Sequence, residues 1–385
     1  MSRTRHIRNT FSVLAYFVAV ISALVVIASA FAGHIHPRHS ELLPVVSLAL
    51  PYVTAVALLV LLLLALLRMK WPAIIVATAL ILSLGSIRLV CPVNIFGDSV
   101  SDSDSTFTLI SFNVRNFGIY DGMQKEINPN MRYVLDVYPD VVILQEASLT
   151  KYHYETINSV KPLLDELEQK YPYRSHGWHD VIILSRHPYK FVSDELKWRD
   201  IEHGYDSESD HRRYFGKVFD VYKGSDTIRV IGVHLQSIGL SEDDKEAYVD
   251  MTHVKNMKEL NDNKPNLRLF KNSILRKIRT AAMLRALQAR KLRDVLDRSH
   301  GNVVLCGDFN DGPGSYSYRT VRGDDMRDAF VDCGLGPVTT YNEHRLFFKI
   351  DHLLYKGNMK ALSYVREKTG DSDHYPQLVT FRIGK

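Results

Sequence analysis

The sequence has little cysteine and lacks several common catalytic motifs. Its 385 residues include three cysteines, Cys91, Cys306 and Cys333, which are too few and too scattered for a disulfide framework. It also contains no GxxxxGK[ST] phosphate loop, no HExxH motif and no GxSxG nucleophile elbow. These absences argue against nucleotide-driven phosphoryl transfer, zinc proteolysis and serine-based acyl transfer.

Charge is distributed unevenly along the chain. Of the net charge of +5, residues 1–95 contribute +6, from seven Lys/Arg and one Glu, which leaves −1 for residues 96–385. The larger part therefore lacks the general positive charge of a polyanion-binding protein. Within it, residues 253–298 hold 13 Lys/Arg and 4 Asp/Glu. A solvated helix face is the simple interpretation of that segment, and contact with anionic lipid headgroups or a phosphate-rich substrate is the alternative.

Long apolar runs crowd the first quarter of the chain. They cover about residues 11–32, 42–67 and 73–93, and Arg88 interrupts the third near its end. A bilayer core of about 30 Å needs roughly 20 helical residues, so each run is long enough to cross it. The sequence therefore predicts a membrane anchor of three transmembrane helices within residues 1–96.

The basic residues around these runs predict the orientation of the anchor. Arg3, Arg5 and Arg8 precede the first run, and Arg68 and Lys70 lie between the second and the third. Basic flanks favour the cytoplasmic side, so we expect the rest of the chain outside the cytoplasm, in the periplasm of a bacterium or on its external face. A cleaved signal peptide is an alternative interpretation of the first run, and it leaves this orientation unchanged.

Beyond a polar linker at residues 97–106, short apolar segments alternate with helical patterns and show no internal repeat. Strands are predicted at residues 107–113, 141–145, 181–185, 216–222, 228–234, 303–306, 350–355 and 377–383. Helices are predicted at residues 124–138, 157–170 and 273–298. This alternation predicts one α/β domain over residues 107–385.

Polar side chains recur at the ends of these predicted strands. They are Asn113, Glu146, His234, Asp308, Asn310, Asp351, Asp373 and His374. If the strands converge at one rim, these residues form a pocket of carboxylates, amides and imidazoles without a cysteine ligand. Hard oxygen donors of this kind suit Mg²⁺, with Mn²⁺ or Ca²⁺ as alternatives. Such a set of groups is suited to attack of water on a phosphate ester, although any single buried carboxylate is more often structural.

Seven short motifs, in this order, carry a resemblance to a known family. LISFNVRN, VVILQE, VIILSRHP, VIGVHLQS, VVLCGDFND, IDHLLY and SDHYP resemble the endonuclease/exonuclease/phosphatase superfamily. That group includes deoxyribonuclease I, abasic-site endonucleases, neutral sphingomyelinases and inositol polyphosphate 5-phosphatases. The resemblance covers residue 107 to the C-terminus, and it implies a four-layer α/β sandwich with two mixed β-sheets face to face and helices outside.

The resemblance also implies roles for the metal-binding and water-binding residues. Glu146 would be the principal metal ligand, with Asn113 beside it and Asp373 close to the metal. Asp308 of GDFN would orient the attacking water. Asn310 would contact the scissile phosphate.

Further roles follow from the same resemblance. Asp351 would hold His374, which would stabilise phosphate charge or transfer a proton. His234 resembles the second catalytic histidine of the deoxyribonuclease and sphingomyelinase branches. Arg186 of ILSRHP is a candidate phosphate-binding residue, with a structural ion pair as the alternative.

Together these observations predict a membrane-anchored, Mg²⁺-dependent phosphodiester hydrolase with no obligate protein partner. The family most often implies a nucleic acid as substrate. A lipid phosphodiester is the main alternative, because the tether holds the domain close to headgroups, and a phosphomonoester is the third. A non-catalytic receptor for phosphorylated ligands is disfavoured, because degenerate members usually lose a metal carboxylate or the terminal histidine, and this sequence keeps both.

Overall fold

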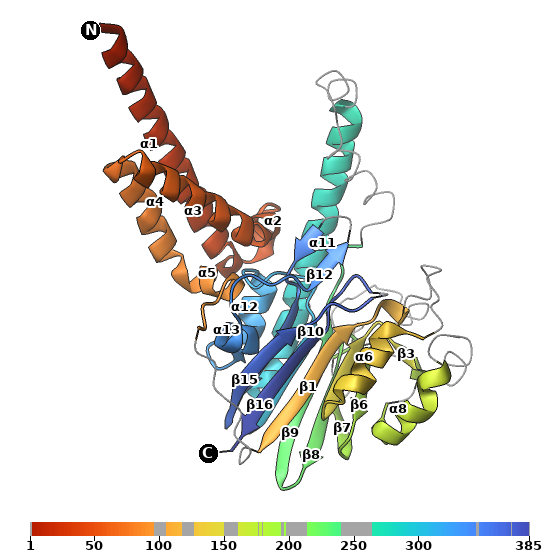
Figure 1. Ribbon diagram of the computed structural model, residues 1–385. Coiled ribbons are helices and arrows are strands. Elements are labelled where there is room, and N and C mark those ends of the chain that lie inside the picture. The colour runs from red at the N-terminus through yellow and green to blue at the C-terminus, as the bar shows by residue number, and fades with distance from the viewer. Residues whose placement is uncertain are drawn as a thin grey trace.

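The computed structural model describes residues 2–95, 105–117, 127–149, 161–175, 177–178, 180–193, 196–197, 214–239, 264–343, 346–370 and 372–384. In it, a group of N-terminal helices stands on one end of an α/β sandwich (Figure 1). Most of the predicted linker at 97–106, and the first part of the basic segment 253–298, lie outside the described residues.

Two six-stranded sheets form the centre of the sandwich. The first has the order β15-β16-β1-β2-β6-β4 and the second the order β11-β14-β10-β9-β8-β7. Strands of the first are β1 (Thr106–Asn113), β2 (Val141–Gln145), β4 (Tyr173–Arg174), β6 (Val181–Ser185), β15 (Met359–Arg366) and β16 (Gln377–Ile383). Strands of the second are β7 (Tyr189–Ser193), β8 (Gly216–Lys223), β9 (Asp226–His234), β10 (Asn302–Asp308), β11 (Arg327–Asp328) and β14 (Asp351–Lys356).

Both sheets are mixed. Strands β1 and β2 are parallel, as are β9 and β10, whereas β16 and β14 run antiparallel to their neighbours. Two short ribbons lie apart from the sheets and pair β3 (Ser148–Leu149) with β5 (Gly177–Trp178), and β12 (Tyr341–Glu343) with β13 (Leu346–Phe348). All eight predicted strands are confirmed, each within two residues at either end.

The sheets pack face to face over an apolar core. Leu109, Ile143 and Ile183 of the first sheet meet Val230 and Val304 of the second, and all five are fully buried. Because helices cover the outer faces too, the central strands are apolar on both sides and read as continuous Val, Ile and Leu runs. These strands were predictable for that reason.

Helices complete the four layers. On the first sheet lie α6 (Pro129–Val137) and α8 (Leu164–Lys170), the latter preceded by a 3₁₀ turn at Lys161–Leu163. On the second sheet lie α11 (Lys264–Asp297) and α12 (Tyr316–Arg322), and α13 (Ala329–Cys333) packs at its edge. The predicted four-layer sandwich is confirmed, and so are the three helices in the part of the chain that the structure describes. Helix α6 is shorter than predicted and α11 begins nine residues earlier. Of the predicted helix 157–170, α8 covers Leu164–Lys170, and residues 157–160 lie outside the described residues.

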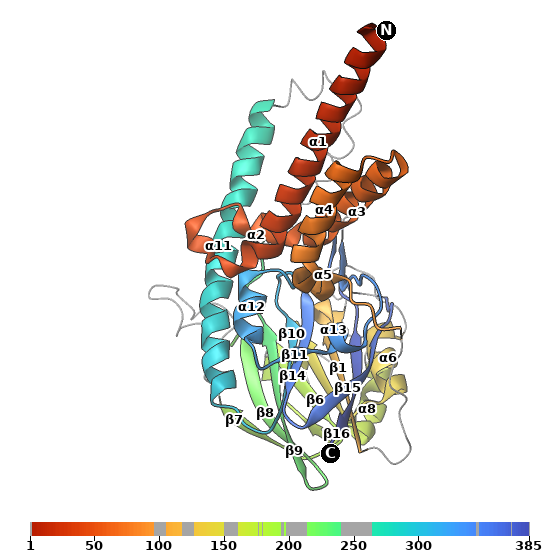
Figure 2. The ribbon, with the colours of Figure 1, turned by 90° about the vertical axis from the view of Figure 1, so that its left-hand side faces the viewer.

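The N-terminal region folds as α1 (Ser2–Phe31), α2 (Leu43–Leu48), α3 (Leu50–Leu66), α4 (Lys70–Leu82) and α5 (Leu84–Val90), with 3₁₀ turns at Ala32–His34 and Pro37–His39. Helices α1, α3 and α4 pack side by side. The start of α1 and the turn between α3 and α4 lie at the end of this group farthest from the sandwich (Figures 1 and 2).

The prediction of three membrane-spanning helices requires a correction. Among the described residues, one helix, Thr10–His34, is long and apolar enough to cross a membrane. The second run breaks at Ala49, and its longer part, α3, has 17 residues, about 26 Å at 1.5 Å per residue, which is short of a hydrocarbon core of about 30 Å. The third run bends by 68° between α4 and α5, so it makes a second span only if both parts cross together.

The N-terminal helices are firmly docked on the sandwich. Gly33 lies against the loop after β10 so closely that a Cβ atom there would fall 1.9 Å from the carbonyl oxygen of Gly314. Arg319 of α12 donates hydrogen bonds to the carbonyl of Ala30 (3.1 Å) and the hydroxyl of Ser86 (2.8 Å). The helices therefore hold the loop that follows the GDFN motif.

Candidate functional site

Four central strands end at one rim of the sandwich. Asn113 at the end of β1 pairs with Gln145 at the end of β2, next to Glu146. Asp308 at the end of β10 pairs with His234 at the end of β9. Because each pair is parallel and the two sheets face each other, these polar side chains meet at the carboxyl ends of the strands.

The backbone at this rim adopts unusual conformations. Glu146 and Asn310 have φ values of +48° and +51°, in the left-handed region that side chains other than glycine seldom adopt. Gly307 has φ of +146°, and a Cβ atom there would lie 1.9 Å from the carbonyl oxygen of Val233. The glycine of GDFN thus permits close approach of β10 to β9, and local strain at Glu146 and Asn310 is concentrated where function is expected.

Asn113 links two carboxylates. Its Nδ2 donates to Oε1 of Glu146 and to Oδ2 of Asp308, both at 3.1 Å, while its Oδ1 accepts the backbone N–H of Arg115. Its amide nitrogen, rather than its oxygen, therefore faces the carboxylates. In this arrangement Asn113 positions Glu146 and Asp308.

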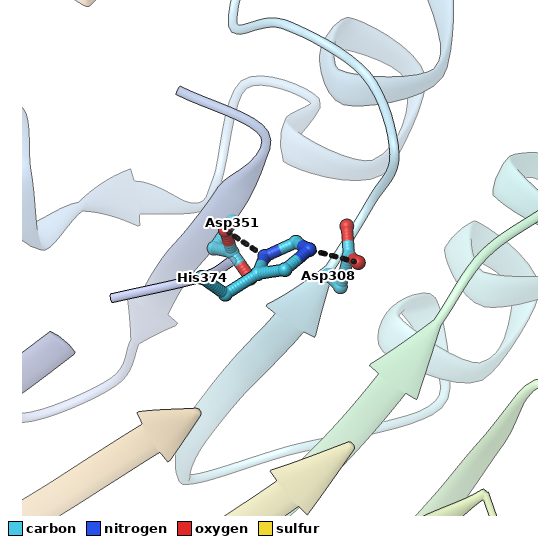
Figure 3. A group of neighbouring side chains, drawn as sticks. All are labelled: Asp308, Asp351 and His374. Atoms are coloured by element: carbon cyan, nitrogen blue, oxygen red, sulfur yellow. Dashed lines mark hydrogen bonds and ion pairs between the residues drawn. The ribbon is translucent and has the colours of Figure 1, made fainter. Parts of the chain in front are cut away.

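His374 lies between two carboxylates. Its Nδ1 is 3.0 Å from Oδ2 of Asp351, and its Nε2 faces Oδ2 of Asp308 at 3.6 Å (Figure 3). All three side chains are buried. Asp351 thereby fixes the orientation of the ring, and Nε2 is directed towards the same carboxylate that Asn113 holds.

His234 makes a second arrangement of the same kind. Its Nδ1 is 2.9 Å from Oδ2 of Asp180, and its Nε2 lies 3.6 Å from Oδ2 of Asp308 and 3.7 Å from Oε1 of Glu146. Two histidines, each oriented by its own aspartate, therefore converge on Asp308.

The charges in this cluster depend on one another. Burial by itself lowers the pKa of His374, but the carboxylates of Asp351 and Asp308 outweigh that effect and raise it to about 10. The pKa of His234 is likewise lowered by burial and raised by Asp180 and then Asp308, to about 10. Burial raises the pKa of Asp308, against the opposing charge of both histidines. The protonation of each of these three side chains therefore depends on the charges of the other groups in the cluster.

Further carboxylates crowd the open side of the rim. Burial raises the pKa of Asp373; His374 and Arg115 oppose this shift, and the charges of Glu343 and Glu146 add to it. Nη1 of Arg115 lies 2.7 Å from Glu343 and 3.5 Å from Asp373. Repulsion among close carboxylates is what a bound cation relieves, so the donor set fits a hard divalent ion.

Two sets of residues come into question as ligands for such an ion. Asp308, Asp351 and His374 offer ligand atoms within 4.8 Å of one another. However, both nitrogens of His374 already face carboxylates, which is the geometry of a hydrogen-bonded relay. Glu146 is 37% exposed and lines the cleft together with Asp373. We therefore favour Glu146 and Asp373 as the oxygen donors.

The rim opens into a cleft of about 600 Å³. Its polar part is formed by Arg115, Glu146, Asp308, Asn310, Glu343, Asp373 and His374. Its remaining lining comes from Val45, Leu48, Ala49, Tyr52, Ser237, Ile238, Ile274, Ile278, Tyr341, Phe348 and Ile350. Residues from both the N-terminal helices and the sandwich thus enclose the same space.

Seven of the residues singled out from the sequence lie together at this rim or in direct contact with a member of it, and Asp351 supports them through His374. Arg186 does not join them. It follows β6 at the opposite end of the sheet, about 13 Å of strand away, where its guanidinium stacks 4.2 Å from the ring centre of Tyr138 and lies 3.6 Å from Asp140. The structural ion pair is therefore the interpretation that its placement favours.

Sequence reasoning missed Asp180, Arg115 and Glu343. Asp180 immediately precedes β6, and the predicted strand at 181–185 offered the signal that a carboxylate stands at its start. Arg115 follows Asn113 by two residues in LISFNVRN. Glu343 lies on strand β12 of the short β12–β13 ribbon, which no pattern in the sequence predicts, so only the tertiary structure reveals it.

Comparison with known families shows the family to which the sandwich belongs. The profile of the Endonuclease/Exonuclease/phosphatase family matches residues 110–374, which is more than half of the chain. The protein therefore belongs to that family, whose members are phosphoester hydrolases. A domain of unknown function matches residues 11–90. A comparison with curated proteins found no match.

Solved structures resemble about three quarters of this chain. An endonuclease/exonuclease/phosphatase family protein from Bacteroides thetaiotaomicron is 15% identical, with a TM-score of 0.44, and the match covers 74% of this chain and all of that one. Truncated TDP2 from Caenorhabditis elegans is 16% identical, with a TM-score of 0.44, over 72% of this chain and 98% of that one. ANGEL2, a 2′,3′-cyclic phosphatase, is 16% identical, with a TM-score of 0.41, over 75% and 99%.

Proposed function

We propose that this protein is a divalent-metal-dependent phosphodiester hydrolase in which water attacks phosphorus. One observation carries the proposal: two aspartate-bound histidines converge on buried Asp308 beside the exposed carboxylate of Glu146. This set offers a base, hydrogen-bond donors for a phosphate and oxygen ligands for a cation in one cleft, as phosphate ester hydrolysis requires.

Glu146 and Asp373 would hold the metal ion, Mg²⁺ in the first instance and Mn²⁺ or Ca²⁺ as alternatives. When bound, such an ion stabilises negative charge on the phosphate oxygens. Asn113 keeps Glu146 and Asp308 at a fixed separation through its two 3.1 Å hydrogen bonds. It is therefore proposed as a positioning residue for the metal site.

Asp308 would accept a hydrogen bond from the attacking water and orient it towards phosphorus. Asn310 donates one amide hydrogen to the carbonyl of Leu235 at 3.0 Å, which fixes the side chain and leaves its second amide hydrogen for a phosphate oxygen. The water oxygen joins phosphorus, and the bond from phosphorus to the leaving oxygen breaks.

His374 and His234 would stabilise the negative charge that develops on the phosphate oxygens. Each ring is fixed at Nδ1 by an aspartate, so each can direct an Nε2–H hydrogen bond into the cleft. The leaving oxygen receives its proton from this pair or from water. The Asp351–His374 pair is the better placed for that role, because His374 lines the cleft.

We further propose that the N-terminal helices attach the enzyme to a membrane, with the sandwich outside the cytoplasm. Helix Thr10–His34 has the required length and hydropathy. The turn at Arg68 between α3 and α4, with Lys70 at the start of α4, lies at the end remote from the sandwich (Figure 1), where the preference for basic residues on the cytoplasmic side would place it.

The test is hydrolysis of bis(p-nitrophenyl) phosphate by the full chain in detergent. We expect turnover with Mg²⁺ that chelation lowers at least about 100-fold, or about 2.7 kcal/mol in the barrier. Glu146→Gln and His374→Ala should lower turnover similarly. Glu168→Gln, at an exposed glutamate, and His300→Ala, at an exposed histidine, are matched controls. Wild-type turnover by Glu146→Gln and His374→Ala would refute the assignment.

A further inference from the structure

One wall of the cleft is apolar and comes from two parts of the chain far apart in sequence. Val45, Leu48, Ala49 and Tyr52 belong to the segment of α2 and α3, and Ile274 and Ile278 belong to α11. We call these six residues the apolar wall. It shares the cleft with Glu146, Asp308, Asp373 and His374, so a substrate with its phosphorus at the rim and a long apolar group has this wall beside it.

The apolar wall is held in place by polar contacts at its edges. The hydroxyl of Tyr52 donates a 2.5 Å hydrogen bond to the carbonyl of Phe347. Glu41, just before α2, pairs with Arg279 of α11. A Cβ atom at Gly312 would lie 3.2 Å from the side chain of Leu48, which shows how closely α2 meets the loop after β10. The wall is therefore part of the folded site.

Helix α3, which supplies Tyr52 to this wall, and its neighbour α4 carry large exposed apolar side chains. Leu66, Trp71, Ile81 and Leu82 on α3 and α4 are each more than 60% exposed. Large apolar side chains left exposed on one group of helices indicate contact with a membrane or a partner. Both α1 and α11 extend from the sandwich on the same side (Figures 1 and 2). The cleft thus lies where the sandwich meets the apolar helices.

The charge of the cleft disfavours a polynucleotide. Among the described residues that line it, Arg115 carries the permanent positive charge, and it is paired with Glu343. Nucleic-acid grooves use rows of Lys and Arg along successive phosphates, often with exposed aromatic stacking. A cleft with one cation-dependent phosphate position and an apolar remainder suits a molecule with one phosphate and a hydrocarbon chain.

We infer that the substrate is a phosphodiester of a lipid, with its phosphate at the catalytic rim and its hydrocarbon chain along the apolar wall. The inference rests on the proposed hydrolase function and specifies its substrate. In the reaction one water is consumed: its oxygen bonds to phosphorus, one phosphorus–oxygen ester bond breaks, and the released alcohol oxygen takes a proton. The products are an alcohol and a phosphomonoester, one of which carries the lipid chain.

The experiment compares lipid and soluble substrates with the full chain in detergent. Mixed micelles contain phosphatidylethanolamine, phosphatidylglycerol or sphingomyelin, and bis(p-nitrophenyl) phosphate is the soluble reference. Val45→Asn and Ile278→Asn place an amide in the apolar wall from its two sides. We expect each to lower kcat/KM on the long-chain lipid at least about 10-fold and to leave turnover of the soluble diester within about twofold.

Leu287→Asn is the matched control, because Leu287 also lies on α11 and is 38% exposed but does not line the cleft. It should leave both activities unchanged. Equal losses on lipid and soluble diester, or faster hydrolysis of a single-stranded DNA oligonucleotide than of any lipid, would overturn the inference. Turnover of the soluble diester without turnover of any lipid would overturn the lipid assignment alone. No turnover of either would overturn the hydrolase proposal as well.

Discussion

Both ends of the sandwich carry carboxylates and basic side chains, but basic groups prevail at one end and carboxylates at the other. At the end away from the cleft, the carboxylate of buried Asp140 lies 2.7 Å from a side-chain nitrogen of both Lys223 and His187. It also accepts a hydrogen bond from the backbone N–H of Thr108 at 2.8 Å. Arg186 adds a third basic group at 3.6 Å. One carboxylate is thus surrounded by several donors.

At the cleft, the balance is reversed. Asp308 and Glu146 both accept hydrogen bonds from the amide nitrogen of Asn113. The Nε2 atoms of His234 and His374 lie 3.6 Å from Asp308, but each ring is paired at Nδ1 with another aspartate. Asp373 has Arg115 at 3.5 Å, but that guanidinium is closer to Glu343. Carboxylates therefore outnumber permanent cations among the described residues at this rim.

This difference separates a structural cluster from the proposed catalytic one. Around Asp140, burial opposes ionisation, but hydrogen bonds from Lys223 and His187 outweigh it and lower the pKa. Its charge is satisfied within the fold. Asp373 keeps a raised pKa, because its neighbours do not offset burial. Unmet negative charge at an open cleft is what the proposed binding of a cation and a phosphate requires.

The largest effect is expected from Asp308→Asn. An amide keeps the shape of the side chain but cannot serve as the base for water, so kcat on bis(p-nitrophenyl) phosphate should fall about 1,000-fold, or about 4 kcal/mol. Asp297→Asn, at an exposed aspartate on α11, is the control. A loss of less than tenfold in a folded Asp308→Asn variant would remove Asp308 from the mechanism.

Asp351→Asn should cost about 100-fold in kcat, or about 2.7 kcal/mol, because it removes the charge that orients His374. Steady-state kinetics should place the loss in kcat, with KM changed less than threefold. A loss confined to KM would mean that Asp351 acts on substrate binding instead.

At the opposite end, Asp140→Asn should lower the free energy of unfolding by about 2 kcal/mol, since two charge-assisted hydrogen bonds are weakened. Turnover per folded molecule should be unchanged. Asp136→Asn, at an exposed aspartate of α6, should change stability by less than about 0.5 kcal/mol. Chemical denaturation followed by tryptophan fluorescence measures both.

The same variant has a defined pH dependence. The pKa of Asp140 is lowered on folding from its usual value near 3.8. The extra free energy of unfolding that this carboxylate gives the wild type is therefore fully present above that pH, and it is lost as the pH falls through the pKa of the folded state. The stability difference between wild type and Asp140→Asn should therefore shrink below about pH 4. A difference that stayed constant down to pH 3 would contradict the assignment of this ion pair.

The smallest effect is expected from Arg186→Ala. Its guanidinium is partly exposed and contacts Tyr138 and Asp140, so stability should fall by less than about 1 kcal/mol. Activity should stay within twofold of wild type. A loss of activity above tenfold would return Arg186 to the phosphate site and weaken the contrast between the two ends.

Much of the sandwich was predictable because its strands are buried on both faces. Strands β2 and β6 begin and end where their Val, Ile and Leu runs predict, and β16 does so with alternating buried and partly buried residues. Strand β15 was missed, because Lys360 and Ser363 interrupt its apolar pattern on an edge strand, where pairing with β16 supplies the stability instead. The helix breaks at Ala49 and Ser83 were missed because a hydropathy pattern measures apolar length and not helix direction.

The sequence alone determined which residues are candidates for the site: carboxylates, amides and imidazoles placed after apolar segments must emerge where buried strands reach the surface. Tertiary structure alone decided which of them meet. Asp180, Asp308 and His234 come together because parallel pairing aligns the ends of β9 and β10 and sheet packing brings β6 opposite. It also decided that α2 and α11 enclose the cleft, because contacts such as Gly33 with Gly314 depend on backbone proximity that no local pattern encodes.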